Sequence, residues 1–548
     1  MPKREPPSLE LVLKRNSVER IKREMSPVAL LDQWQERLVA PVYEHIPEED
    51  IVRLRWFGLY HDSPKVGLFM MRVKIPSGIL SPAGLRVIGE VSEQWGRNHG
   101  ELTTRQNIQL HYLTLEKFPV IFERLDRVGL TTRHACGDVA RNVTGCPVAG
   151  IDRDEFFDVT KLVAETAKFY TFNPDYEDLP RKHKITIAAC KHQCNAPEIN
   201  DIAMVGMVHP DGRRGFAIQV GGGQSSTPRL ARHLGVFVMP EQALAVMRAI
   251  TDVWKNTTEY RLSRVRARLK FMLDDYGPDG FRQLVETRLG RELERLADPP
   301  PPEPESDHMG IHPQREPGRV YVGFPVYLGL MSGTQMKQIA ALAEEIGGDI
   351  RLTRRQNFIL TGIPEARIDE ITTRVAEIGF PLDVNQLYAS SIGCIGDPNC
   401  NFAVTPTKSK LATIIQRLVT DFGDTAGPLK VNLDGCPHAC GQHWTGDIGL
   451  QGTTGRGPSG EPLMAYDIIL RGGLGRDAAI GKPLLRRVPA DYVEDYVSRL
   501  VASYIERRQP DETFTQYCKR TPDAALIAIA HGSDNVMESA SEPAADEA

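Results

Sequence analysis

Several features that would place a chain in a large protein class are missing from this 548-residue sequence. It contains no run of about 18 apolar residues, which excludes a membrane-spanning helix. The opening stretch MPKREPPSLELVLKRN has no apolar core, so we expect no secretory signal and a cytoplasmic protein. The net charge of −5 argues against a general nucleic-acid-binding protein.

A disulfide framework is also missing from this chain. Nine cysteines without a secretory signal are not the pattern of a disulfide-stabilised domain, whereas free thiols fit a reducing compartment. The glycine run that starts at Val220 lacks the GxGxxG spacing of a dinucleotide-binding turn. No flavin or nicotinamide domain is visible, so a redox function would need electrons from outside.

Four cysteines in the C-terminal half form two pairs, Cys394 with Cys400 and Cys436 with Cys440. Pro437 predicts the first turn of a helix, which would place the second pair on one face. Five residues separate the first pair and three the second. Structural zinc usually has two to four residues between ligands, whereas a cubane cluster accepts more varied spacing. The spacing favours an iron–sulfur cluster, with zinc and unrelated buried thiols as open alternatives.

The chain contains an internal duplication. The segment LTTRQN around Arg105 recurs as LTRRQN around Arg355, and Cys190 and Cys194 recur as Cys436 and Cys440. Ordered matches separated by about 250 residues indicate two copies of one unit. The segment DPPPPEPESDH, residues 298–308, lies between the copies and predicts a stiff, exposed linker without chemistry.

Each copy alternates strand and helix patterns. In the first copy, GLFMMRVKI reads as a strand, the segment from Ser81 as a helix with a start signal, and KITIAA and DIAMVGMV as strands. The second copy repeats this with VYVGFPVYL, MKQIAALAEEIG and NFILTG. These patterns predict an α+β chain with two small and two larger mixed subunits. We expect the N-terminal 50 residues, which have no counterpart, to wrap over the surface.

Basic residues in four segments are candidates for binding an anion. Arg105 would ordinarily be read as an exposed arginine at a strand start, but Arg355 occupies the same position in the second copy. Arg141 lies among small residues that allow a close backbone approach. Lys182 and Lys184 alternate at a strand start, which places both ammonium groups on one face, although a solvated face has the same pattern. The segment YRLSRVRARLKF also reads as a solvated face.

The motifs GCPHACGQ and GDIGLQG, after a C-x5-C pair, resemble those of the sirohaem nitrite and sulfite reductases. The resemblance covers about residues 50 to 520. It implies pseudo-two-fold halves, each with a ferredoxin-like subunit and a larger one, around a central sirohaem. It also implies that Cys394, Cys400, Cys436 and Cys440 hold a 4Fe–4S cluster, with Cys440 bridging to the sirohaem iron.

The resemblance assigns roles to the basic residues too. Arg105, Arg141, Lys182 and Lys184 match the substrate-binding residues, while Arg355, Arg266 and Lys270 would face the cofactor. Family members reduce sulfite to sulfide or nitrite to ammonia with six electrons. Plant-type nitrite reductases typically have asparagine at the second lysine position, so Lys184 favours sulfite. The donor would be ferredoxin, with a flavoprotein as the alternative.

Two further expectations complete the sequence reading. Cys136, Cys146, Cys190 and Cys194 are read as remnants of the repeat or buried thiols, and less readily as a second metal site. A non-catalytic, zinc-stabilised cysteine-rich protein is the rival class. The predicted division is an extension (1–50), a ferredoxin-like half (51–130), a sirohaem-binding domain (131–297), the linker (298–308), a second ferredoxin-like half (309–385), a sirohaem and cluster domain (386–530) and a disordered tail (531–548).

Overall fold

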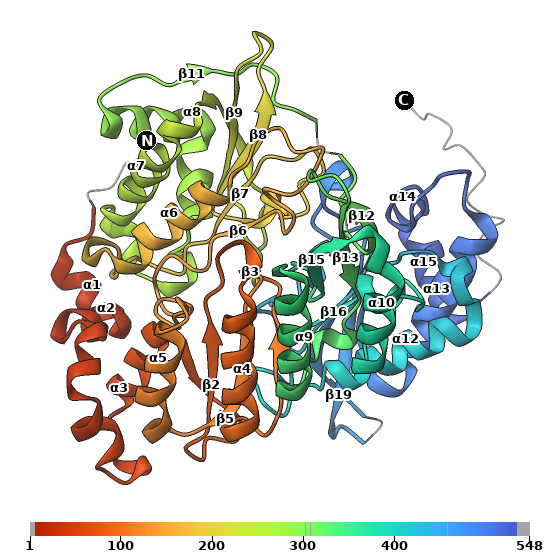
Figure 1. The fold of residues 1–548 in the computed structure, drawn as a ribbon, viewed down its shortest axis with the longest axis horizontal. Helices are drawn as coiled ribbons and strands as arrows, with labels where there is room; N and C mark the ends of the chain where they lie inside the picture. Colours follow the sequence, from red (N-terminus) through yellow and green to blue (C-terminus); the bar gives the residue numbers. More distant parts are fainter. Residues whose placement is uncertain (1–5, 302, 307, 458, 534–548) are drawn as a thin grey trace, which may run out of the picture. The chain divides into compact units, whose positions relative to one another are not determined.

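The computed structural model of the chain describes residues 6–301, 303–306, 308–457 and 459–533 (Figure 1). It divides into two compact units. Unit 1 comprises Met1–Gly223 and Arg229–Leu382, and unit 2 comprises Gln224–Pro228 and Asp383–Ala548. Among the described residues, no helix combines the length and the apolar character needed to cross a membrane.

Unit 1 contains two small subunits built from the same succession of elements. The first has the sheet order β1-β2-β5-β4, with strands β1 (Leu59–His61), β2 (Phe69–Val73), β4 (Glu101–Leu102) and β5 (Ile108–Leu113) and helices α4 (Pro82–Trp95) and α5 (Phe118–Asp126). The second has the order β12-β13-β15-β14-β3, with β12 (Gly310–Pro313), β13 (Arg319–Phe324), β14 (Ile350–Leu352) and β15 (Phe358–Pro364), joined by β3 (Ile79–Leu80) of the first copy, and helices α9 (Gly333–Ile346) and α10 (Ile368–Ile378). These elements confirm the predicted strand and helix patterns.

Local signals explain where the paired helices begin. The Ser81 hydroxyl accepts a hydrogen bond from the Gly84 N–H at 3.1 Å, and Pro82 occupies the first turn of α4. Ser332 and Gln335 form a capping box at the start of α9. Equivalent caps in the two copies place α4 and α9 equivalently on their sheets.

The two small subunits pack against each other around one core. Helices α4 and α9 lie side by side (Figure 1), and a Cβ added at Gly89 would come within 2.6 Å of the Gly333 carbonyl oxygen. The side-chain amide of an equivalent glutamine in each copy donates to a backbone oxygen of the other copy. Gln106 Nε2 donates to Leu352 O at 3.0 Å, and Gln356 Nε2 donates to Leu102 O at 2.8 Å. This reciprocity is the pseudo-two-fold relation that the repeat predicts.

The two larger subunits share one topology. In unit 1 the sheet order is β11-β10-β9-β8-β7-β6, and in unit 2 it is β16-β17-β18-β19-β20. The first comprises β6 (Thr144–Gly145), β7 (Ile185–Ala188), β8 (Ile202–Val208), β9 (Arg214–Val220), β10 (Arg232–Val238) and β11 (Glu294–Arg295). The second comprises β16 (Ile392–Gly393), β17 (Val431–Asp434), β18 (Ile448–Arg456), β19 (Pro462–Leu470) and β20 (Lys482–Pro489). The three strands that come first in the sequence of each sheet, β6 to β8 and β16 to β18, pair in parallel. The next strand of each sheet, β9 or β19, pairs antiparallel with them.

Helices complete each larger subunit. In unit 1 they are α6 (Thr160–Phe172), α7 (Ala243–Lys255) and α8 (Leu269–Leu289), and their apolar residues share a buried core with the sheet. In unit 2 they include α12 (Lys408–Phe422), α13 (Val493–Arg507), α14 (Phe514–Arg520) and α15 (Asp523–His531). Because neighbouring parallel strands end at the same edge of their sheet, the loops that follow them also emerge at that edge. These loops carry most of the cysteines.

The N-terminal segment is packed more deeply than the expected surface wrap. It forms α1 (Leu9–Arg15), α2 (Ser17–Glu24) and α3 (Glu48–Arg53), with short 3₁₀- and π-helical segments between α2 and α3. Leu30, Trp34 and Leu38 belong to the core of the small subunits. The segment therefore adds to the core of unit 1.

The expectation that the whole linker is exposed is wrong at its C-terminal end. The Glu305 side chain is 6% exposed, where it pairs with two arginines, and His308 is buried. Buried charges and imidazoles need partners, and these two residues have them. The predicted disordered tail (531–548) is wrong at its first residue, because His531 is the last residue of helix α15. Residues 534–548 of this prediction lie outside the described residues.

Candidate functional site

Unit 1 brings together a group of cationic side chains from segments far apart in the sequence. We call this group the cationic cluster; it consists of Arg72, Lys74, Arg105, Arg141, Lys182, Lys184 and Arg268. Burial, followed by the charge of Arg141, lowers the pKa of Arg105 to about 9. Burial likewise lowers the pKa of Lys184 well below its usual value, and the charges of Arg105 and Lys182 lower it further. Because these like charges lower one another's pKa, binding of an anion among them is favoured.

Both terminal nitrogens of Arg105 are held by hydrogen bonds, whereas its Nε can still donate one. One terminal nitrogen donates to Asn142 O at 2.6 Å and to Ile185 O at 3.2 Å, and the other donates to Asn200 Oδ1 at 2.8 Å. Its Nε is buried and has no hydrogen-bond partner among the described residues. An unpartnered buried donor is costly unless a ligand satisfies it.

Arg141 is fixed by backbone oxygens. Its Nε and one terminal nitrogen donate to Gly137 O at 3.0 and 2.9 Å. Within the described parts of the chain, no carboxylate lies within ion-pair distance of Arg105 or Arg141. Both charges therefore remain available to a bound anion, and a cofactor rich in carboxylates or an oxyanion fits the cationic cluster.

Lys182 and Lys184 confirm the alternation that the sequence predicts. His183 between them is fully buried and stacks on Trp254, so it points to the opposite side. The lysines lie just before β7 rather than inside it, because β7 begins at Ile185. The Lys184 N–H donates to Asp201 Oδ2 at 2.7 Å, which fixes the start of this strand.

The segment that begins at Tyr260 divides between the cationic cluster and the surface. Arg268 forms a bidentate pair with Asp201, at 3.0 and 2.8 Å. Burial, and then the charge of Arg268, lowers the pKa of Lys270 to about 7. Arg266 instead has a side chain that is 63% exposed and contacts Asp275 at 3.4 Å. The structure therefore brings Lys270 to the cluster and leaves Arg266 outside it.

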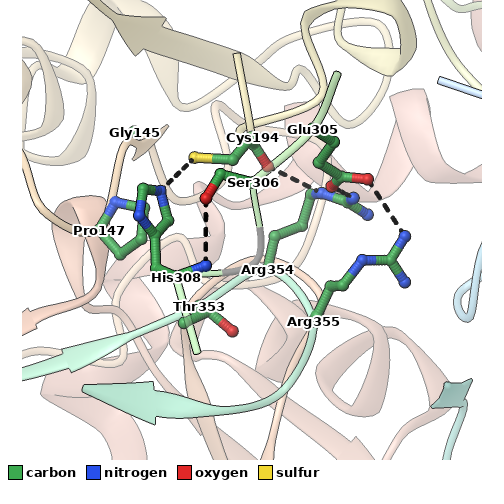
Figure 2. Close-up of a pocket in the computed structure, with 9 residues that line it drawn as sticks. All are labelled: Gly145, Pro147, Cys194, Glu305, Ser306, His308, Thr353, Arg354 and Arg355. Carbon is green, nitrogen blue, oxygen red and sulfur yellow. Dashed lines mark hydrogen bonds and ion pairs between the residues drawn. The ribbon is translucent and has the colours of Figure 1, made fainter. Parts of the chain in front are cut away.

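Arg355 lies in a different environment from Arg105, its counterpart in the repeat. Figure 2 shows Arg354 and Arg355 both facing the Glu305 carboxylate. The Arg355 guanidinium lies 3.2 Å from Glu305 Oε2, and its side chain is 4% exposed. Arg355 is thus paired with a residue of the linker.

In unit 2, parallel pairing brings the two cysteine loops together. Cys394 follows β16 and Cys436 follows β17, and these strands are parallel neighbours. The Gly435 N–H lies 3.4 Å from Cys394 Sγ, and Val404 N–H donates to Gly435 O at 2.9 Å. A Cβ added at Gly435 would lie 2.9 Å from the Ala403 side chain and 2.9 Å from Thr405 O. Only glycine allows the loops to approach so closely.

The four cysteines of unit 2 fit a cubane better than a zinc ion. Burial raises the pKa of Cys436 to about 12, and the charges of Cys440 and Cys400 add to this. Among the described residues, no three of these four sulfurs lie within 4.8 Å of one another. Zinc–sulfur bonds of about 2.3 Å in a tetrahedron would require sulfurs about 3.8 Å apart. A cluster with one thiolate on each iron spaces its ligands more widely.

The helix predicted at Pro437 is wrong. Residues 436–440 form a turn, and Ala439 has a φ of 54°, in the left-handed region that ends any helical run. The first copy has the same turn, with Gln193 at a φ of 49°. Cys436 and Cys440 are therefore presented by a loop.

The first copy has its own group of thiols. The sulfurs of Cys146, Cys190 and Cys194 all lie within 4.8 Å of one another, and the three residues are buried. Cys136 lies apart from them, with its sulfur 3.1 Å from a terminal nitrogen of Arg72. All four residues are buried, which agrees with either reading, buried thiols or a second metal site.

Sequence reasoning missed Lys74 and Arg72, and it included Arg268 in the basic segment without predicting its pairing with Asp201. The signal for Lys74 was present, since a lysine within an apolar strand must be buried or at an end. Arg72 lies two residues before Lys74, inside β2, which ends at Val73. Asp201 had a weaker signal: it recurs as Asp447 in the second copy.

Two family descriptions match most of the chain, and each matches it twice. The nitrite and sulphite reductase 4Fe-4S domain matches residues 136–293 and 388–520. The nitrite/sulfite reductase ferredoxin-like half domain matches residues 61–128 and 312–378. The double matches agree with the duplicated fold.

Individual relatives are similar over nearly the whole chain. A sulfite reductase [ferredoxin] 2 of Mycolicibacterium paratuberculosis is 33% identical over 538 residues, which covers 93% of this chain and 96% of the relative. An assimilatory ferredoxin-dependent nitrite reductase of Haloferax mediterranei is 34% identical and covers 88% of each chain. The solved structure of the Mycobacterium tuberculosis NirA protein superposes with a TM-score of 0.88 at 32% identity, covering 93% of this chain and 97% of NirA.

Proposed function

The chain belongs to the nitrite and sulphite reductase family, and from this premise we propose that it reduces sulfite to sulfide with electrons from ferredoxin. The family is one of oxidoreductases, so the alternative of a non-catalytic zinc-binding protein is rejected. Nitrite reduction to ammonia is the second candidate, because relatives that reduce nitrite are as similar to this chain as those that reduce sulfite. Sequence identity alone therefore does not select the substrate.

The cationic cluster is the observation that supports this proposal. Arg105 and Arg141 have no carboxylate partner within ion-pair distance in the described parts of the chain, and Lys182 and Lys184 alternate beside them. Sulfite carries up to two charges and three oxygens, whereas nitrite carries one charge and two oxygens. A pocket with two arginines and two lysines suits the more highly charged anion. Each charge-assisted hydrogen bond contributes ~1.5–3 kcal/mol.

When bound, sirohaem would supply an iron able to bind a small anion, and the 4Fe–4S cluster would supply electrons one at a time. For the cluster we propose Cys394, Cys400, Cys436 and Cys440. The exposure of Cys440, in contrast to buried Cys436, would leave its thiolate accessible to the sirohaem. Arg355, Lys270 and Arg266 were expected to hold the cofactor's carboxylates; we retain this for Lys270, which faces the cationic cluster.

The chain's own side chains bind the anion and provide protons. The guanidinium groups of Arg105 and Arg141 hold oxyanion charge in place, and removal of one such preorganised donor costs about 10²–10³ in rate. The oxygens of the substrate leave as water, so protons must be delivered as well. Burial, followed by the charges of Arg141 and Arg105, lowers the pKa of Lys74 to about 7, a value suited to holding and releasing protons near neutral pH.

The test is a comparison of kcat/KM for sulfite and nitrite, with reduced ferredoxin as donor, in the wild type and in Lys184→Asn. Sulfite should lead in the wild type, and the substitution should lower kcat/KM for sulfite roughly tenfold or more, and by less for nitrite. Lys161→Asn is the matched control, because Lys161 is 88% exposed on α6. A wild type that strongly prefers nitrite would show that the two-lysine argument is wrong.

A further inference from the structure

Three thiols of unit 1 converge on one point, and the imidazole of His308 approaches one of them. Cys146 directly follows β6, and Cys190 and Cys194 lie in the turn after β7. The Cys194 and Cys146 sulfurs are 4.0 Å apart, and Cys194 Sγ is 3.3 Å from His308 Nε2. Figure 2 shows the Cys194 sulfur and the His308 ring facing each other. All three sulfurs fall within 4.8 Å of one another.

The three sulfurs have the spacing of ligands of a single tetrahedral ion, and His308 Nε2 lies at ligand distance from the Cys194 sulfur. Zinc bonds of about 2.3 Å to sulfur and about 2.0–2.1 Å to nitrogen place two sulfurs about 3.8 Å apart, and sulfur and nitrogen about 3.6 Å apart. A disulfide needs sulfurs about 2.05 Å apart, whereas all nine cysteines are free. A cubane needs wider spacing, as the four cysteines of unit 2 have. One mononuclear site therefore accounts best for the arrangement.

The repeat explains why thiols gather at this place. Cys190 and Cys194 occupy the positions of Cys436 and Cys440, and Cys146 follows β6 as Cys394 follows β16. The first copy has no cysteine where the second has the remaining member of its set. His308 reaches the same point from the linker. Three inherited positions and one new side chain thus give four donors.

The imidazole is oriented for this role. His308 is buried, and its Nδ1 lies 3.3 Å from the Tyr321 hydroxyl, which leaves Nε2 directed at the thiols. Arg354 Nε donates to the Cys194 carbonyl oxygen at 3.1 Å and fixes the loop that carries that cysteine. A closed set of three thiolates and one imidazole is a known type of structural zinc site.

We propose that unit 1 binds one structural Zn²⁺ ion. Its ligands are Cys146, Cys190, Cys194 and His308. Binding converts the three thiols to thiolates and releases their protons to solvent, with no change in oxidation state. The ion ties the end of the linker to two loops of the first large subunit. This site is separate in sequence from the cysteines proposed for the 4Fe–4S cluster.

The test measures metal content and ligand type in untagged holoenzyme from zinc-supplemented cells. Elemental analysis should find about one zinc per chain in addition to the iron of the cofactors, and zinc-edge absorption should show three sulfur ligands and one nitrogen ligand. Cys190→Ser and His308→Ala should lose most of the zinc. Cys518→Ser, which removes a buried thiol of α14, should keep it.

Full iron with no zinc would overturn the proposal, as would zinc that both variants retain. A zinc signal with only nitrogen and oxygen ligands would also overturn it. If Cys190→Ser fails to fold, the wild-type absorption spectrum and the zinc content of His308→Ala decide the question. Iron content and sulfite reduction are recorded separately, so a failure of the zinc proposal is distinguishable from a failure of the proposed function.

Discussion

Lys74 is an unusual ionisable side chain of unit 1. It is 3% exposed, and its ammonium group donates to Thr171 Oγ1 at 2.7 Å and lies 3.4 Å from Ala140 O. Burial lowers its pKa from 10.5 to about 7, and the charges of Arg141 and Arg105 contribute. A lysine in this state makes the stability of the fold depend on pH.

The sign of that dependence follows from proton counting. Between the folded pKa of about 7 and the unfolded pKa of 10.5, the unfolded chain binds more protons at this residue. The free energy of unfolding therefore rises with pH in this window, by at most about 1.4 kcal/mol per pH unit from this one group. The contribution is complete above the unfolded pKa and is lost as pH falls through the folded pKa.

We predict that Lys74→Met reduces this dependence. Urea unfolding of the holoenzyme at about pH 7 and about pH 9 should show a smaller gain in stability for the variant than for the wild type. Lys161→Met, on an exposed side chain, should behave as the wild type does. Parallel pH profiles for wild type and Lys74→Met would contradict the prediction.

At this scale the sequence was informative where side chains alternate or recur. The same-face placement of Lys182 and Lys184 follows from the two-residue period of extended backbone, and the structure agrees. Lys74 escaped notice because its strand reads as apolar, and a period does not reveal which face of a strand meets other charged residues. Pairing between residues far apart in the sequence, such as Arg268 with Asp201, leaves no pattern in either local segment.

At the scale of elements, the loops after parallel strands decide what the cysteines can hold. Pro437 predicted a helix, but the left-handed Ala439 ends the turn and returns the chain toward β18. Proline at a first helical position and proline in a turn have the same local pattern. The sequence could therefore predict that the cysteines pair up but could not predict the backbone that presents them.

We predict that Gly435→Ala separates the two cysteine loops of unit 2. The added Cβ would meet Ala403 and the Thr405 carbonyl at 2.9 Å, so one loop must shift. Iron and acid-labile sulfide per chain should both fall, and the cluster's electron paramagnetic resonance signal should weaken. Gly280→Ala in α8 is the control, since its nearest contact would be the Tyr276 side chain at 3.7 Å. Unchanged iron and sulfide in Gly435→Ala would count against a cluster on these loops.

At the scale of the whole molecule, the duplication is the part of the fold that the sequence predicts best. The recurrence of LTTRQN placed the two small subunits in equivalent roles, and the crossed amides of Gln106 and Gln356 show that relation in the structure. The exchange of β3 (Ile79–Leu80) onto β14 of the second copy could not be foreseen, because a two-residue strand leaves no periodic pattern.

The N-terminal segment, which lies outside the duplication, is joined to unit 1 by buried charges. Glu19 and Lys22 have side chains that are 1% exposed, and they contact each other, Asp178 and Arg261. Buried ion networks are weak evidence for net stability, but removal of one member leaves an uncompensated charge. The segment is therefore anchored by charge as well as by apolar packing.

We predict that Glu19→Ala lowers the free energy of unfolding by roughly 3–5 kcal/mol, because Lys22 and Arg261 then retain only Asp178 as a counter-charge. Glu10→Ala, on an exposed position of α1, should change it by less than about 0.5 kcal/mol. Chemical unfolding followed by circular dichroism gives both values. A similar small effect for both variants would mean that the segment is only loosely attached.

His308 belongs to the joint between the two repeats rather than to either repeat. Two ancestral copies encoded as separate chains would have had no joint, and hence no residue at this place. On the proposed ligand set, the mixed thiolate and imidazole site can exist only in a fused chain. Its origin is then later than the gene fusion, whereas the four-cysteine pattern of the second copy needs no fusion at all. The metal would mark the order of events in the history of this fold.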